Sequence, residues 1–420
     1  MRDIAILFIL LSLAWAAWLR PWLGVLGLAV FAYLNPQAYG VGFMRGFPVY
    51  QTLFVVVCLS LGWEAYRRGT LPKLHWDWRI PVFLLLWACF LFTTWQSQFP
   101  WAAWIKLSEI SKLFLALLPT LLLIDTRRKF FFLIATIAIS FGLVTLKGGY
   151  WAVMTGFQDR VYGPPGSHFG GNNEFAVAMA MNIPLLVLWL REAGGRRLRW
   201  TLMAMVGLSY AAVLSSWSRG GLITLAVATA FLLWSGKRRH LMLPLLLAGG
   251  VLAMTALPEK WFERMGTITT YEQDASATSR LDAWRVGLAY ARAHPFTGAG
   301  FDGWIAVQPD PEHPMAWHSS YVQIVTEHGL LGLTLWSLLI FGSMLALTRL
   351  AWLAGRARAP PWAGDYAAML RASLAAYAAG GVFLGLAYWD IPYHLIALSV
   401  LLGHLARKEA GMSARQPASP

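Results

Sequence analysis

Four residues from separate stretches of the chain have side chains suited to transfer chemistry on a phosphate-containing substrate. They are Arg160, Arg219, Arg280 and His318. A guanidinium group presents a fork of N–H donors that matches the oxygens of a phosphate or diphosphate. An imidazole titrates near neutral pH and can take a proton from an acceptor hydroxyl. Arginines would stabilise the charge on a leaving diphosphate, and His318 would activate the acceptor without a metal ion.

Each candidate also has a purely structural interpretation. Arg160 follows Asp159 and could simply pair with it, and a histidine at a helix start is usually structural. Asn172, Asn173 and Glu327 are predicted to support the site because they are polar residues at the edge of, or inside, apolar stretches.

Residues 279–294 predict an amphipathic helix lying on the outer surface of the protein. Ser279 and Asp282 have the spacing of a capping box, which places Arg280 in the N-terminal turn, and Pro295 ends the helix. The alternative is an interfacial helix whose arginines only extend toward water.

Two further patterns in this region are weak. Residues 298–303 fit G-x-G-x-x-G, but no strand precedes them, so they predict a tight turn rather than a dinucleotide site. Asp310, Glu312 and His313 lie in a proline-rich loop and are poor grounds for a metal site. Cys58 and Cys89 lie inside apolar runs. Neither a metal ion nor another cofactor is therefore predicted.

The composition is that of an all-α, polytopic membrane protein. Apolar residues make up 58% of the 420 residues, charged residues 13%, and the mean hydropathy is +0.53. The net charge of +14 is dispersed at the ends of apolar runs, which argues against a nucleic-acid partner.

Apolar runs of membrane-spanning length recur along the whole chain, and the first is read as a retained helix rather than a signal peptide. They predict about 12 transmembrane helices, or 13 if the first two, which are short enough to form a hairpin, each cross the membrane. The segments are 4–19, 22–34, 47–66, 80–96, 105–124, 129–148, 173–191, 200–217, 219–235, 240–257, 319–349, 372–388 and 391–406. The predicted organisation is N-terminal transmembrane helices (1–257), a large periplasmic loop (258–318), C-terminal transmembrane helices (319–407) and a cytoplasmic tail (408–420).

Loop charges predict the orientation. If the chain alternates strictly, the loops rich in arginine and lysine all fall on one side, which the positive-inside rule assigns to the cytoplasm. The opposite loops are 35–46, 97–104, 149–172, 258–318 and the turn at Asp390. The four candidate residues then share the outer face, where a diphosphate indicates a lipid-linked donor.

The motifs around these residues resemble the O-antigen ligase and polymerase superfamily of bacterial envelope enzymes. The matching elements are Gly171-Asn172-Asn173-Glu174-Phe175-Ala176, Ser218-Arg219-Gly220-Gly221, Ser279-Arg280 with Trp284, and His318-Ser319-Ser320-Tyr321 followed by Glu327 and Gly329. The opening of the chain, through Arg20-Pro21-Trp22 and Tyr33-Leu34-Asn35-Pro36, looks like the exosortase-associated O-glycosylation ligase branch.

The resemblance implies a metal-independent, C-type glycosyltransferase in the bacterial inner membrane, with its active site facing the periplasm. Its donor would be a preassembled glycan on undecaprenyl diphosphate. His318 matches the family's essential histidine, Arg219 and Arg280 match its diphosphate-binding arginines, and Arg160 is a looser match. The family often has asparagine where this chain has Ser319, which affects local hydrogen bonding to the acceptor rather than the base.

Several functions remain open at this level. Lipid A–core is the predicted acceptor, with a protein hydroxyl or a growing polysaccharide as alternatives within the superfamily. An alternative of another class is a flippase or transporter of lipid-linked glycans. Such a protein would carry charges at mid-bilayer and repeated halves, and this sequence shows no evident internal repeat.

Overall fold

The computed structural model describes the whole chain except residues 237–238, 267–274, 304–306, 308–315 and 414–420. Helices account for 78% of the residues, and the described part contains no strand. This confirms the prediction of an all-α protein.

The helices follow one another with short connections. They are α1 (Arg2–Leu19), α2 (Pro21–Tyr33), η1 (Pro36–Tyr39), α3 (Val49–Arg68), α4 (Arg79–Trp95), α5 (Pro100–Leu123), α6 (Arg127–Met154), α7 (Asn172–Glu192), α8 (Arg196–Leu214), α9 (Arg219–Ser235), α10 (Arg239–Ala256), α11 (Glu259–Gly266), α12 (Ala275–Ala293), α14 (Ser320–Gly355), α15 (Pro361–Gly380) and α16 (Asp390–Ser413). All thirteen predicted segments overlap one of these helices.

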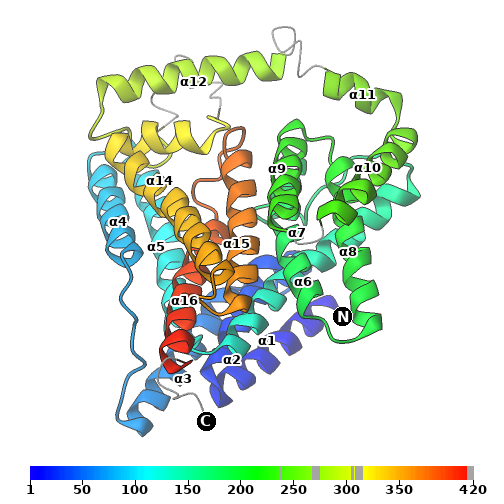
Figure 1. Ribbon diagram of the computed structural model, residues 1–420. Coiled ribbons are helices and arrows are strands. Elements are labelled where there is room, and N and C mark those ends of the chain that lie inside the picture. Colours follow the sequence, from blue (N-terminus) through cyan, green and yellow to red (C-terminus); the bar gives the residue numbers. More distant parts are fainter. Residues whose placement is uncertain (237–238, 267–274, 304–306, 308–315, 414–420) are drawn as a thin grey trace.

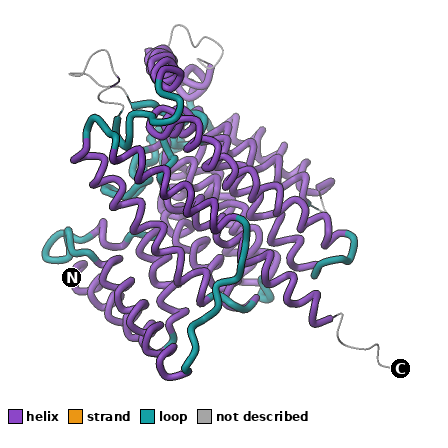
Figure 2. The backbone as a smooth tube through the Cα atoms, turned by 90° about the vertical axis from the view of Figure 1, so that its left-hand side faces the viewer, coloured by secondary structure: helices purple, strands orange, loops and turns teal. Residues whose placement is uncertain are grey.

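Most helices form one bundle, and α11 and α12 lie across one end of it (Figure 1). The view turned by 90° shows the same crossing segment above the bundle (Figure 2). Helix α15 lies inside the bundle, where it packs against α7, α9 and α14 and is buried along most of its length. Helices α1 and α2 form a hairpin, because Gly24 packs on Ala17 and Gly27 packs on Leu13.

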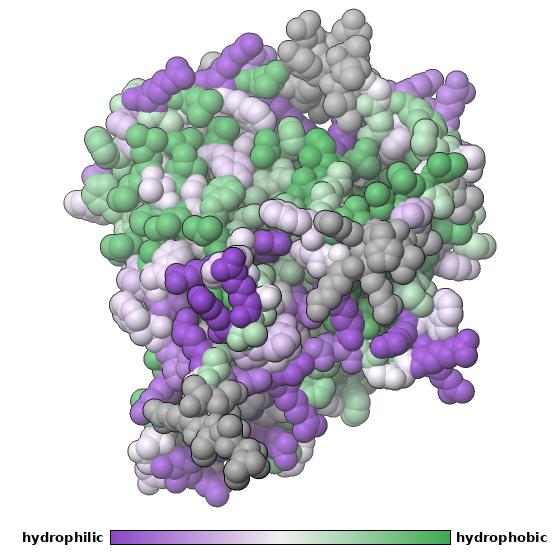
Figure 3. All heavy atoms as spheres, viewed as in Figure 1, coloured by the Kyte–Doolittle hydropathy of each residue, from purple (hydrophilic) through white to green (hydrophobic). Residues whose placement is uncertain are grey.

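Several helices have the length and composition needed to cross a membrane. Five in the described part qualify on both counts: α1, α3, α6, α7 and α14, and four shorter apolar helices accompany them. On the face shown in Figure 3, apolar residues form a broad band beneath α11 and α12, with hydrophilic residues above and below it. The chain is a membrane protein, and the count of about 12 spans stays a prediction.

Helix α15 corrects one predicted segment. The apolar run predicted a helix over 372–388, whereas α15 covers Pro361–Gly380 and the next residues form a turn. Asp365 and Arg371 lowered the apparent hydropathy of the first half. Asp365 pairs with Arg191 at 2.8 Å, and the Arg371 guanidinium donates to Ser235 and Thr348 at 3.2 Å. Protein partners, not lipid, therefore surround these charges.

The loops predicted to face outward lie at the same end of the bundle. Ser97 Oγ donates to the Ala299 carbonyl at 3.1 Å, and Val161 N donates to Ser215 O at 2.9 Å. Ser320 N donates to Gly381 O at 2.7 Å. These bonds join residues from the predicted outer loops to one another and to the ends of α8, α14 and α15. We call this end, which carries α11 and α12, the α12 end.

Candidate functional site

The turn before α9 positions Arg219. Asn172, at the start of α7, donates from Nδ2 to the Ser216 carbonyl at 2.8 Å. Ser218 caps α9 by accepting a hydrogen bond from Gly221 N at 3.0 Å. The predicted supporting role of Asn172 therefore has a physical basis: it fixes the turn that leads into Arg219. Asn173 lies beside it, half-buried at the start of α7.

Trp217 brings two more arginines to this turn. The Arg160 guanidinium lies 5.5 Å from the centroid of the Trp217 ring, and Arg264 Nε donates to the Trp217 carbonyl at 3.0 Å. No ion pair joins Arg160 to Asp159 in the described part of the chain, so the simple pairing is wrong. Arg264 was missed as a site residue, although it is a basic residue in a loop predicted to face outward.

Arg280 and His318 meet where α12 crosses the start of α14. Trp284 Nε1, on α12, donates to the Trp317 carbonyl at 2.6 Å. Gly287 permits this close crossing, since an added Cβ would lie 2.8 Å from Thr326 Oγ1. The predicted helix therefore exists and ends before Pro295, but it begins at Ala275. Ser279 is inside the helix rather than its cap, and Arg280 is in the second turn.

The charge of Arg280 acts on His318. Burial lowers the pKa of the His318 imidazole, and the nearby Arg280 guanidinium lowers it further. Both effects favour the neutral ring. A neutral imidazole near physiological pH is the form that a general base requires. His318 also has a φ of 44°, a left-handed conformation that is uncommon for a residue with a side chain.

One turn contacts both the Arg219 and the His318 segments. The Ser320 hydroxyl donates to Leu384 O at 2.8 Å and accepts from Leu386 N at 2.9 Å. On the other side, a Cβ added to Gly220 would lie 3.5 Å from the Cβ of Phe383. The connection between α15 and α16 thus lies between the start of α9 and the start of α14.

Helix α14 is interrupted at Gly329, whose φ and ψ are 66° and −168°. The turn at 295–303 supplies the missing partners: Ala299 N donates to Thr326 O and Gly300 N to Glu327 O, both at 2.9 Å, while Leu330 N donates to Pro295 O at 2.7 Å. Prediction of a tight turn at 298–303 is confirmed. The predicted continuous helix over 319–349 is wrong, because this turn inserts into it.

Glu327 is buried rather than placed at the water interface, as the sequence predicted. Tyr388 donates to its carboxylate, and the same hydroxyl lies 2.8 Å from His328 Nε2. His328 Nδ1 lies 2.7 Å from Thr93 Oγ1 of α4. This buried network joins α4, α14 and the turn before α16. Glu327 therefore supports the site through packing, and His328 is a partner that the sequence did not reveal.

No group of three or more metal-ligating side chains occurs among the described residues. Asp310, Glu312 and His313 lie outside the described residues.

The comparisons with known families agree with the motifs. Residues 203–337 match the family model described as O-antigen ligase, and this range contains Arg219, Arg280, His318 and Glu327. The chain belongs to the O-antigen ligase superfamily. Residues 1–195, which include Arg160, Asn172 and Asn173, match a family of unknown function (DUF5935). No curated protein matches the chain.

Membership of the superfamily gives the arginine and histidine arrangement a chemical context. The superfamily acts on glycans as ligases or polymerases, and its substrates are lipid-linked glycans in general. The closer resemblance to the exosortase-associated branch stays a prediction.

Proposed function

We propose that this protein transfers a preassembled glycan from undecaprenyl diphosphate to lipid A–core at the periplasmic face of the inner membrane. The observation that carries the proposal is the pairing of Arg280 with a partly buried His318 whose pKa is lowered. Arginine provides charge for a diphosphate, and the neutral imidazole beside it provides a base. The Arg219 turn reaches the same region through the connection between α15 and α16.

The proposed reaction needs only groups that this chain supplies. The acceptor hydroxyl attacks the anomeric carbon of the glycan while the bond to the diphosphate oxygen breaks. His318 takes the hydroxyl proton, and undecaprenyl diphosphate leaves with its bonding electrons. Arg219 and Arg280, with Arg160 close to the Arg219 turn, bind the diphosphate and stabilise its growing charge.

The direct test is transfer by the purified protein in detergent. Lipid-linked glycan and rough lipopolysaccharide are mixed with the protein, and a ladder of ligated lipopolysaccharide is expected on a gel. A flippase would give no new covalent product under these conditions, because it only moves its substrate across a membrane.

Chelation tests the mechanism separately. Transfer is expected to survive exhaustive treatment with EDTA, since arginine charges replace the role that Mg²⁺ has in other transferases. Loss of activity that Mg²⁺ or Mn²⁺ restores would disprove this and return attention to Asp310 and Glu312.

Lipid A–core is proposed over a protein hydroxyl because the described residues of the 258–318 segment are largely α11 and α12, which lie on the bundle. A lipid-anchored acceptor can approach laterally between helices and needs little additional surface. Offering rough lipopolysaccharide and a candidate acceptor protein together decides the matter, and glycan found only on the protein would overturn the choice.

A further inference from the structure

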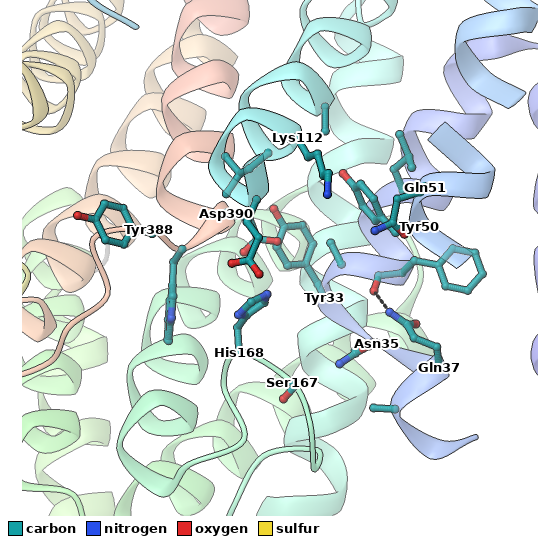
Figure 4. Close-up of a pocket in the computed structure, with 18 of the residues that line it drawn as sticks. Tyr33, Asn35, Gln37, Tyr50, Gln51, Lys112, Ser167, His168, Tyr388 and Asp390 are labelled. Atoms are coloured by element: carbon teal, nitrogen blue, oxygen red, sulfur yellow. Dashed lines mark hydrogen bonds between the residues drawn. The ribbon is translucent and has the colours of Figure 1, made fainter. Parts of the chain in front are cut away.

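A cavity of about 1140 Å³ lies at the α12 end, apart from the arginines and His318. Its walls come from α2, α5, the segment after α2, residues 165–168 and the turn before α16 (Figure 4). Most of these residues lie within the range that matches the family of unknown function, so that match assigns no role to them.

Helix α5 presents a row of charged residues to this cavity. Lys106, Glu109 and Lys112 are spaced three residues apart, on the helix face that lines it. Lys106 Nζ lies 3.0 Å from Glu109 Oε2, whereas Lys112 forms no ion pair within the described residues. Lys112 lies about 18 Å along the helix from Pro100, at 1.5 Å per residue. Charges at such depth in a membrane protein face water or a ligand and indicate function.

Other polar groups converge on the same space. The imidazole of His168 faces the carboxylate of Asp390, and Tyr33 and Tyr50 lie close by (Figure 4). Tyr33 Oη lies 2.8 Å from His394 Nδ1.

Three atoms of cavity-lining side chains are buried without a hydrogen-bond partner. They are Gln37 Oε1, Gln323 Oε1 and His394 Nε2. Buried polar atoms are normally satisfied, so orphaned atoms around one cavity indicate that a hydrogen-bonding ligand or water belongs there.

We propose that this cavity binds the acceptor as an acidic saccharide, a hydroxyl-rich sugar that carries a phosphate group. The proposal rests on the transfer function proposed above and adds where the acceptor binds. Amides, tyrosines and carboxylates exchange hydrogen bonds with sugar hydroxyls, and Lys112 provides the charge that attracts the phosphate. Arg45, exposed on the same wall and without an ion pair among the described residues, adds a second cation.

The position of the cavity fits an acceptor site. Gln323 lines it and donates its backbone N–H to Ser319 O at 2.9 Å. Gln323 is thus one helical turn, about 6 Å along the axis, from the residue that follows His318. The turn that holds Ser320 also forms the cavity wall at Gly385 and Tyr388. A saccharide in the cavity would therefore lie next to the segment that carries the base.

The test measures binding without the donor, so its result does not depend on transfer. The probe is core oligosaccharide released from rough lipopolysaccharide, used intact and after chemical removal of its phosphates. Lys112→Met and Gln323→Leu are compared with Lys73→Met, a matched control whose lysine lines a second cavity of about 640 Å³. Size-exclusion profiles and thermal midpoints show whether each variant is folded.

The expected result is a tenfold or larger loss of affinity on dephosphorylation for the wild type and no further loss for Lys112→Met. Gln323→Leu should bind both probes more weakly, and Lys73→Met should behave as the wild type. Equal binding of the intact probe by the wild type and both cavity variants would overturn the proposal, as would a wild type that transfers glycan but does not bind either probe. Oligosaccharide binding without transfer would instead disprove the proposed function and keep the site. If Lys112→Met does not fold, Lys112→Gln replaces it in the same comparison.

Discussion

The two ends of the bundle differ in how their backbones and charges are arranged. Six non-glycine residues in the described part have a positive φ, and five of them, Asn35, Phe157, Trp217, Asp302 and His318, lie at the α12 end. Only Ala357 lies at the opposite end. Each such conformation costs roughly 1–3 kcal/mol and persists only where surrounding contacts enforce it.

At the opposite end, basic residues pair directly with carboxylates. Arg127 pairs with Glu192 at 3.1 Å, and Lys129 pairs with Asp125 at 2.8 Å. At the α12 end, the described contacts of Arg160 and Arg264 are with the ring and the carbonyl of Trp217. The difference indicates that one end is organised to stabilise the fold, whereas the other maintains a strained backbone to position particular side chains.

The largest expected effect is that of His318→Ala. Loss of a general base should lower the rate of transfer by roughly 10²–10⁴-fold while leaving expression and membrane insertion unchanged. His294→Ala is the matched control, because His294 is an exposed histidine that follows α12. Transfer rates of the purified variants measure the effect. A rate for His318→Ala within several-fold of wild type would mean that this histidine is not the base.

Arginine replacements should have the next largest effect. Arg219→Lys and Arg280→Lys retain the charge but lose the planar fork, so both are expected to bind the lipid-linked diphosphate donor about tenfold or more weakly. Arg285→Lys, on the exposed face of α12 where Arg285 pairs with Asp282 at 3.0 Å, should bind it normally. Donor titrations compare them. Normal donor affinity in both test variants would reduce these arginines to roles at the membrane interface.

The sequence predicted the parts of this site that depend on residue type and on hydrophobic runs. Arginines in loops predicted to face outward and a histidine before a long apolar run were recognisable, and their loops do gather at one end. Alternation of apolar runs and basic loops is a property of each segment and needs no knowledge of packing.

What the sequence missed depends on contacts between distant segments. The break at Gly329 forms because the turn at 295–303 donates hydrogen bonds to Thr326 and Glu327, some 27 residues further along the chain. Burial of Glu327 requires Tyr388 and His328 as neighbours, and no local pattern shows them. The row of charges on α5 was hidden for the same reason, since only the fold shows that it faces a cavity.

A glycine substitution tests whether the irregular backbone at the α12 end has the expected cost. At φ 66° and ψ −168°, Gly329 occupies a region that is essentially restricted to glycine. Gly329→Ala should therefore destabilise the protein by about 1–3 kcal/mol and lower its thermal midpoint. Gly207→Ala is the control, because Gly207 is inside α8 with nothing within 4 Å of an added Cβ. Alanine there should be neutral or stabilising by roughly 0.5–1 kcal/mol. Equal midpoints for the two variants would contradict the strain assigned to the break.

The smallest expected effect is a shift of the pH profile, and it tests the link between Arg280 and His318. Because burial and the Arg280 charge both lower the pKa of His318, its imidazole stays neutral below pH 6.5, and transfer should persist there. As the pH falls through the lowered pKa, the base becomes protonated and kcat/KM declines. Arg280→Gln removes the positive charge, so the pKa of His318 should rise and the acidic decline should begin at a higher pH. Arg280→Lys retains the charge and should keep the decline close to its wild-type position, even though its donor affinity falls. The measurement is kcat/KM between about pH 5 and pH 8, which reports groups of the free enzyme. An acidic decline at the same pH in wild type and in Arg280→Gln would show that the guanidinium does not act on the base, and that burial alone keeps His318 neutral.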